Sequence, residues 1–419
     1  MCALSAQHAK NGALFNDEAS QLEVATWAFE YLHEALSLVP VDFSMMGHQD
    51  LMRSYGFLAL LGTQIGDSNM VQKYLGLYHG ICGRYGLHEE SRWPSNISTC
   101  DREVRRRIFW SIYRLEVHTA CVLGHYVRIP EAQCDVGYPG GIHHPAFVPG
   151  RDGKFEDWFS GWNYSTDLYR ILEHAVVSFR MRKHKHPLPL GLNDGFLSGV
   201  LSKKLSMIKE GLLPQYEKAF FRSDDNGRNR CGFQAANIFC IIHLVRMLTS
   251  LSDDHELDSI CDTAQEMIES MRKIPSEYVR ACGATLLQQV AGVGHLLCVV
   301  ASKESHSTPS LHRLRDVLES ITVFLEISKQ HHEPLATAAS RLREHLGTLE
   351  IDPDPAGTEM KHPSIEVGVP LVVDGADMWI SELDDYGTVS GFGANIFPTT
   401  FLGDITWPFA WSSSSPTSG

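Results

Sequence analysis

The sequence lacks the motifs that mark the common enzyme classes. It contains no Gly-x-Ser-x-Gly nucleophile elbow, no His-Glu-x-x-His zinc motif, no P-loop and no Gly-x-Gly-x-x-Gly fingerprint. Its paired carboxylates, Glu89 and Glu90, are adjacent in the chain, so they do not oppose each other across a substrate as glycosidase carboxylates do. The sequence therefore predicts that the protein is not an enzyme, with an active site assembled from distant segments as the alternative.

Metal-binding cysteine patterns are also missing. The chain has ten cysteines, but no two of them form a Cys-x-x-Cys pair, and several lie in apolar runs, as Cys240 does. Such cysteines behave as small hydrophobic residues in a reducing compartment. His143 and His144, near Cys134, match no familiar zinc spacing. We therefore predict free thiols, no metal site and no cofactor in this chain.

The sequence shows no pattern typical of a secretory signal or of a membrane span. Residues 1–16 have neither a basic start nor a long apolar core, so they are not typical of a secretory signal. No uninterrupted apolar run reaches the roughly 20 residues that a membrane span needs. We expect an intracellular chain without membrane contact.

Positive charge is scarce. The formal net charge is −14, and no Lys or Arg follows Lys361. Nonspecific DNA binding needs clustered Lys and Arg, so this chain alone is not expected to bind DNA broadly. A short basic segment at 182–186, which includes His184 and His186, fits either a solvated surface loop or a weak nuclear import signal.

What the sequence does contain is helical periodicity over most of its first 350 residues. Apolar residues recur at helical spacing in several segments, with almost no strand-like alternation before residue 360. The predicted helices cover 21–38, 50–63, 70–85, 99–123, a segment from about 198, 233–251, 254–273, 276–303, 309–329 and 333–349. Gly and Pro mark a long loop at 135–163 and a second at 184–194. The predicted fold class is all-α, with packed antiparallel helices.

Local signals also place the helix ends. Asp67 is a candidate N-cap for the third helix, and Gly86 is a candidate left-handed terminator after it. Ser98 and Asp101 have the spacing of a capping box at the start of the next helix.

The most distinctive pattern lies between residues 75 and 130. A Gly-Leu-His turn and an Arg-Trp pair precede a Glu-x-Arg-Arg-Arg-x-x-Trp helix, in the residues Gly86, Leu87, His88, Arg92, Trp93, Glu103, Arg105, Arg106, Arg107 and Trp110. This pattern resembles the fungal-specific transcription factor domain, the middle homology region of zinc binuclear-cluster transcription factors. The resemblance implies a helical regulatory domain that dimerises with itself or with a complete family member, senses a small-molecule effector, or restrains an activation segment.

The arginines of this pattern allow two interpretations. At about 100° per residue, Arg105, Arg106 and Arg107 fan out around the helix and do not share one face. We expect their stems to cover the helix and their charges to pair with Glu103, Glu116 or the Glu89–Glu90 pair. Phosphate contact is the alternative.

One feature of the family is not found in these 419 residues. The resemblance implies a cluster of six cysteines that binds two zinc ions and reads DNA, and no such cluster is present. Zinc is therefore expected only if such a cluster precedes this sequence. DNA contact would then be indirect or through that preceding region. A co-regulator that dimerises with a complete family member is an alternative, as is an enzyme or small-molecule-binding protein that reuses the scaffold.

The composition changes after Ile351. Acidic and aromatic residues are mixed without a clean period, and the candidate binding residues are Trp379, Leu383, Tyr386, Phe397, Phe401, Trp407 and Trp411. This composition is typical of a disordered activation segment that a coactivator groove buries on binding. An inert tail, or one docked on the helical domain, is the alternative.

These observations divide the chain into a flexible N-terminus at 1–19, a regulatory domain at 20–350 and an acidic-aromatic tail at 351–419. The resemblance implies a nuclear regulator of transcription in a fungus, of a metabolic or secondary-metabolite gene set.

Overall fold

The computed structural model describes residues 1–13, 27–40, 49–140, 158–183, 194–217, 226–252, 257–301, 307–328 and 333–348. Within these ranges the regular elements are helices, with one isolated parallel bridge between Glu89 and Asp135. The all-α prediction is therefore confirmed for the described part of the chain.

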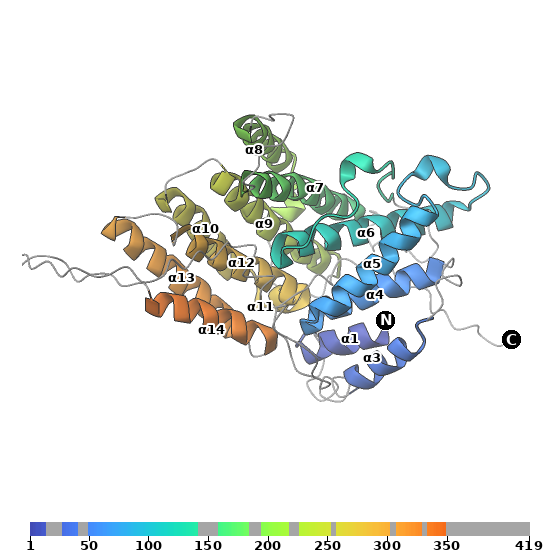
Figure 1. Cartoon of the computed structure of the whole chain (residues 1–419), viewed down its shortest axis with the longest axis horizontal. Coiled ribbons are helices and arrows are strands. Elements are labelled where there is room, and N and C mark those ends of the chain that lie inside the picture. The colour runs from blue at the N-terminus through green and yellow to red at the C-terminus, as the bar shows by residue number, and fades with distance from the viewer. Residues whose placement is uncertain are drawn as a thin grey trace, which may run out of the picture.

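The N-terminal half builds one end and the middle of the molecule (Figure 1). Its helices are α1 Cys2–Lys10, α3 Ala28–Ser37, α4 Gln49–Ile65, α5 Ser68–Arg84, α6 Thr99–Leu123 and α7 Trp158–Lys183, with short 3-10 turns η2 Glu90–Arg92 and η3 Glu131–Gln133. Helices α4 and α5 pack side by side, and α6 lies between them and α7.

The C-terminal half completes the middle and forms the other end (Figure 1). It comprises α8 Asp194–Glu210, η4 Pro214–Tyr216, α9 Asn226–Ser252, α10 Leu257–Arg272, α11 Ser276–Cys282, α12 Ala284–Ala301, α13 Thr308–Ser328 and α14 Glu333–Thr348. The pair α7 and α9 forms the most extensive helix contact.

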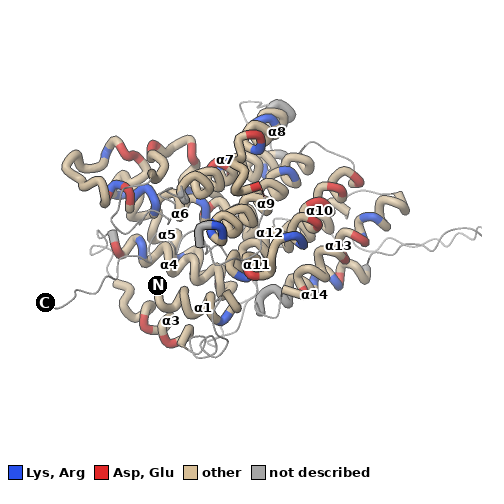
Figure 2. Tube along the Cα trace, turned by 180° about the vertical axis from the view of Figure 1, so that it is seen from behind, with Lys and Arg blue, Asp and Glu red and all other residues tan. Residues whose placement is uncertain are grey.

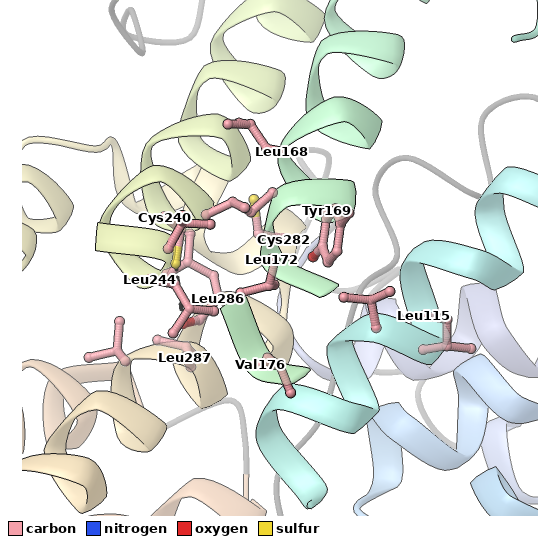
Figure 3. Packing of buried hydrophobic residues seen from close by; sticks show 14 of the residues in the cluster. Leu115, Leu168, Tyr169, Leu172, Val176, Cys240, Leu244, Cys282, Leu286 and Leu287 are labelled. Carbon is pink, nitrogen blue, oxygen red and sulfur yellow. Dashed lines mark hydrogen bonds between the residues drawn. The ribbon is translucent and has the colours of Figure 1, made fainter. Parts of the chain in front are cut away.

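The core runs continuously through the middle of the molecule. Figure 3 shows side chains from α6, α7, α9 and α12 meeting there, including Leu115, Leu172, Leu244 and Leu286. Each of these four residues is at most 1% exposed. Burial of such apolar side chains is the main favourable term in folding and fixes α6 in the centre.

Helix α6 begins and ends where its local signals predict. The Ser98 hydroxyl accepts a hydrogen bond from the Asp101 amide at 3.0 Å and donates one to the Asp101 carboxylate at 2.7 Å. At the other end Gly124 has a φ of 72°, the left-handed conformation that glycine adopts without steric cost. Asp67 likewise caps α5 by accepting from the Met70 amide.

The structure differs from the expected helices at three places. The expected flexible N-terminus contains α1, whose Leu4 is buried against the core. The expected helix 276–303 is two helices, because Gly283 between them has a φ of 68°. Helix α7 was not among the expected helices, and its first turn lies inside the expected loop 135–163. Gly161 belongs to this helix and allows close packing, because a Cβ there would lie 2.6 Å from the Tyr216 ring.

Two helices are long and apolar enough, by length and composition, to cross a membrane: α9 over Arg228–Leu251 and α12 over Ala284–Ala301. The sequence did not indicate them, because polar residues interrupt the apolar run in each. The apolar windows of these helices are 78% and 67% buried inside the molecule. Core helices of a helical domain have the same length, apolarity and burial, and we describe α9 and α12 as such.

Candidate functional site

The candidate site is the segment 85–98 between α5 and α6, which we call the signature segment because it carries the first half of the family pattern, whose members we call the signature residues. Glu90 joins this segment to the rest of the domain. The Glu90 carboxylate accepts hydrogen bonds from Arg102 at 2.9 Å, from Arg106 at 2.6 and 2.9 Å, and from the Gly137 amide at 2.9 Å. The hydrogen bonds from Arg106 are the largest cause that lowers the pKa of Glu90 to about 2. Glu90 therefore holds α6 and the 134–140 loop in place as an ionised carboxylate.

The same loop is held by two further side chains of α6. Glu103 accepts from Arg106 at 2.8 Å and from the Gly140 amide at 2.9 Å. The indole nitrogen of Trp110 donates to the Gly137 carbonyl at 3.1 Å. Figure 2 shows acidic and basic positions close together in this region of the chain. Glu103 and Trp110, two of the predicted signature residues, therefore hold in place a loop that lies about 30 residues further along the sequence.

Backbone hydrogen bonds join the two loops directly. The Asp135 amide donates to the His88 carbonyl at 2.8 Å, and the Glu90 amide donates to the Asp135 carbonyl at 2.6 Å. Trp93 is 6% exposed and donates through its indole nitrogen to the Leu87 carbonyl at 3.3 Å. The Gly-Leu-His turn and the Arg-Trp pair are therefore parts of one small structural unit.

Gly86 begins that unit, with a φ of 60° immediately after α5. The Leu87 amide donates to the Cys82 carbonyl at 2.9 Å, and the Gly86 amide donates to the Gly83 carbonyl at 3.3 Å. These are the two hydrogen bonds of a Schellman motif. A Cβ on residue 86 would also lie 3.2 Å from Cδ of Arg92.

We expect Gly86→Ala to lower the free energy of unfolding by about 1 kcal/mol, because alanine is strained at a positive φ. Gly83→Ala is the matched control: residue 83 lies within α5, and its added Cβ would meet nothing within 4 Å. That change is expected to stabilise by about 0.5–1 kcal/mol. Denaturant titration of both variants checks the prediction, which is wrong if the two shifts have the same sign.

The three consecutive arginines do fan out, and each has a different environment. Arg106 pairs with Glu90 and Glu103, as predicted. Arg107 is buried, with its guanidinium 4.6 Å from the centre of the Phe159 ring. Arg105 lies 5.7 Å from the centre of the Trp93 ring and makes no ion pair within the described residues.

A pocket of about 260 Å³ opens beside Arg105. It lies between the start of α4, the end of α5, the signature segment and α6, and its lining residues are Met52, Tyr78, Tyr85, Leu87, Arg92, Trp93, Pro94, Arg105, Ile108 and Phe109. The signature residues Leu87, Arg92, Trp93 and Arg105 therefore meet at one cavity, which no spacing rule in the sequence revealed.

Another carboxylate of α6, Glu116, has buried partners that the sequence did not reveal. Glu116 is 1% exposed and accepts from His79 at 2.9 Å, from the Arg128 amide at 3.0 Å and from the Arg128 guanidinium at 2.9 and 3.0 Å. Burial opposes ionisation, but the hydrogen bond from His79 and the charge of Arg128 outweigh it, so the pKa of Glu116 is lowered. Glu116 was expected to pair with an arginine of its own helix.

A buried polar group also links α6 to α12. His118 is fully buried, 3.3 Å from the Gln288 side-chain oxygen and 3.4 Å from the Gln289 side-chain nitrogen. Burial lowers the pKa of His118 to about 4, so the ring is neutral at pH 7. The Gln288 and Gln289 side chains that it contacts are uncharged amides, and both belong to α12.

Several predicted residues lie outside the described part of the chain. These are His143, His144, His184, His186 and the tail residues Trp379, Leu383, Tyr386, Phe397, Phe401, Trp407 and Trp411. Among the residues that are described, no group of three His, Cys, Asp or Glu side chains is arranged to hold a metal ion. The Cys134 thiol donates to the Pro130 carbonyl.

Comparison with known proteins confirms the family resemblance of the signature segment. Residues 14–144 match the family described as the fungal specific transcription factor domain. The chain is also similar to the transcriptional activator protein acu-15 of Neurospora crassa, with 21% identity over 296 residues. This match covers 63% of the chain and 30% of the relative, so the chain spans less than a third of that protein. No solved structure matches the chain.

Proposed function

We propose that this chain, which carries the fungal specific transcription factor domain at residues 14–144, is the regulatory part of a transcriptional regulator. The observation that supports the proposal most strongly is the agreement between the family match and the fold. The matched region includes the signature segment, and that segment is built as a structural unit of an all-helical domain. The similarity to a transcriptional activator points to the same role.

The arrangement of the arginines on α6 supports a regulatory role over direct DNA reading. Arg102 and Arg106 share the Glu90 carboxylate, and Arg107 is buried beside Phe159. Side chains that are already paired or buried would have to leave these partners to contact phosphate. We therefore propose that DNA is contacted through another segment or a partner chain, such as a second family member.

The sequence also supports proposals about the location of the protein, its target genes and its C-terminal tail. We propose that the protein acts in the nucleus on a metabolic or secondary-metabolite gene set. We further propose that residues 351–419 are the activation segment and that a coactivator binds their aromatic side chains. Seven acidic residues and no Lys or Arg follow Lys361, so like charges keep these aromatics in water until a groove buries them.

The test is a reporter gene driven by the whole chain fused to a foreign DNA-binding domain. We expect removal of 351–419 to reduce reporter output to the level of the DNA-binding domain alone. A fusion of full length in which the seven named tail residues are alanine is expected to behave like the deletion. The matched control replaces Ser412, Ser413, Ser414 and Ser415 with alanine and is expected to keep full output. Undiminished output from the deletion would reject the assignment of the tail.

A further inference from the structure

The pocket beside Arg105 joins an apolar floor to a positive wall. Met52, Tyr78, Ile108 and Phe109 form the floor, and each is at most 5% exposed. Trp93 adds a nearly buried aromatic wall, and Tyr85, Leu87 and Pro94 complete the apolar part of the lining. A floor of this kind favours a flat apolar group, because contact with it removes apolar surface from water.

Arg105 supplies the positive wall. Two neighbouring arginines of α6 already have a carboxylate partner, because Arg102 and Arg106 pair with Glu90. Arg105 has no carboxylate partner within the described residues, and its closest charged neighbour in the pocket lining is Arg92, another cation. Arg92 pairs at 2.5 Å with Glu89, which does not line the pocket. The pocket thus holds a half-buried guanidinium and no acid.

We propose that this pocket binds a small ligand in which a flat aromatic or apolar group carries a carboxylate. The ring of the ligand lies against Trp93 and Phe109, and its carboxylate accepts hydrogen bonds from the Arg105 guanidinium, whose planar fork matches carboxylate geometry. The volume of about 260 Å³ lies just below the usual range for ligand pockets, so the ligand is small. A cationic ligand is disfavoured by Arg92 and Arg105 together.

The position of the pocket allows a bound ligand to affect the neighbouring loops of the domain. Its walls belong to the signature segment, which Glu90 and Trp110 fasten to the 134–140 loop. A ligand that fixes Leu87 and Trp93 would therefore stabilise both loops together. The role of the ligand as an effector rests on the proposed function, whereas its binding does not.

The binding test uses the purified full chain and a matched set of probes. Phenylacetate has the aromatic ring and the carboxylate, phenylacetamide keeps the shape without the charge, and phenethylamine reverses the charge. Dissociation constants come from ligand-observed NMR titration. We expect phenylacetate to bind about tenfold more tightly than phenylacetamide, or better, because hydrogen bonds to charged groups are the stronger ones.

Three variants locate the binding. Arg105→Gln is expected to remove the preference for phenylacetate while phenylacetamide binding stays unchanged. Arg105→Glu is expected to transfer the preference to phenethylamine. Arg315→Gln is the control, because Arg315 is an exposed arginine on α13 and is not a lining residue; it should keep the wild-type preference. Circular dichroism and thermal melting confirm that each variant is folded.

The outcomes separate this proposal from the proposed function. Equal affinity for the acid and the amide, an unchanged preference in Arg105→Gln, or no binding of any probe to the wild-type chain would overturn the ligand site. A ligand site that behaves as expected in a chain that drives no reporter would leave the pocket assigned and reject the regulatory role.

Discussion

Replacing Glu116 with alanine is expected to lower the free energy of unfolding by about 3–5 kcal/mol, the largest effect of a single change proposed for this protein. Glu116 is almost fully buried and is the shared acceptor for His79, the Arg128 amide and the Arg128 guanidinium. Its removal leaves a guanidinium that is 13% exposed without its carboxylate. Breaking one side of a buried pair costs more than the pair contributes, since the remaining charge stays desolvated.

Three further variants make this prediction specific: Glu266→Ala, Arg128→Ala and the double variant of Glu116 and Arg128. Glu266→Ala is the control, because Glu266 pairs with Arg246 on the surface with a side chain 54% exposed; its loss is expected to cost less than about 1 kcal/mol. The double variant Glu116→Ala with Arg128→Ala should lose less stability than the sum of the two single variants, because no unpaired charge remains. Denaturant midpoints measure all four. Strict additivity would contradict the assigned pairing.

Replacing Glu90 with glutamine is expected to lower the free energy of unfolding by about 2–3 kcal/mol at pH 7. The glutamine keeps the shape of the side chain but lacks the charge that Arg102 and Arg106 share. The Gly137 amide still finds an acceptor in it, so the loss is mainly that of the two charge-assisted pairs. Glu89→Gln is the matched neighbour: Glu89 pairs with Arg92, whose side chain is 65% exposed, and less than about 1 kcal/mol is expected.

The pH dependence of this effect has a definite sign. The pKa of Glu90 in the folded protein is about 2, below its ordinary value of 4.5, because of the hydrogen bonds from Arg106. Between these values the unfolded chain binds the proton and the folded chain does not, so stability falls as the pH is lowered. The contribution of Glu90 is complete above about pH 4.5 and is lost as the pH approaches 2.

The difference in stability between the wild-type protein and Glu90→Gln should therefore be constant from pH 7 to about pH 5 and shrink below it. Unfolding by denaturant at a series of pH values, with Glu89→Gln alongside, measures this difference. A difference that stays constant down to pH 3 would mean that the Glu90 carboxylate is not the group that titrates.

Local signals account for the parts of the fold that the sequence predicted well. Ser98 and Asp101 contact each other across three residues, and Gly124 ends α6 by its own backbone conformation. The helix that they bound could be placed at Thr99–Leu123 because each signal acts within one turn of the chain. Gly86 could be identified in the same way.

Tertiary contacts explain what the sequence did not reveal. Gly161 lies in a stretch whose Gly and Pro content is typical of a loop, but it belongs to α7. A glycine is needed there because Tyr216 and Gln234 approach its backbone closely. Glu116 pairs with Arg128 in the segment after α6, and His118 contacts Gln288, 170 residues away. No periodic pattern encodes such pairs. The pocket beside Arg105 was hidden for the same reason, since its lining comes from three helices and a loop.

The most direct test of the central proposal is chromatin occupancy of the full chain in the organism that produces it. The chain is tagged at its own locus, crosslinked and immunoprecipitated, with an untagged strain as control. The proposed function predicts enrichment at promoters, whether the chain contacts DNA through another segment or through a partner, and loss of transcripts from those genes when the locus is deleted. Occupancy equal to that of the untagged strain, with unchanged transcripts after deletion, would contradict a role in transcription.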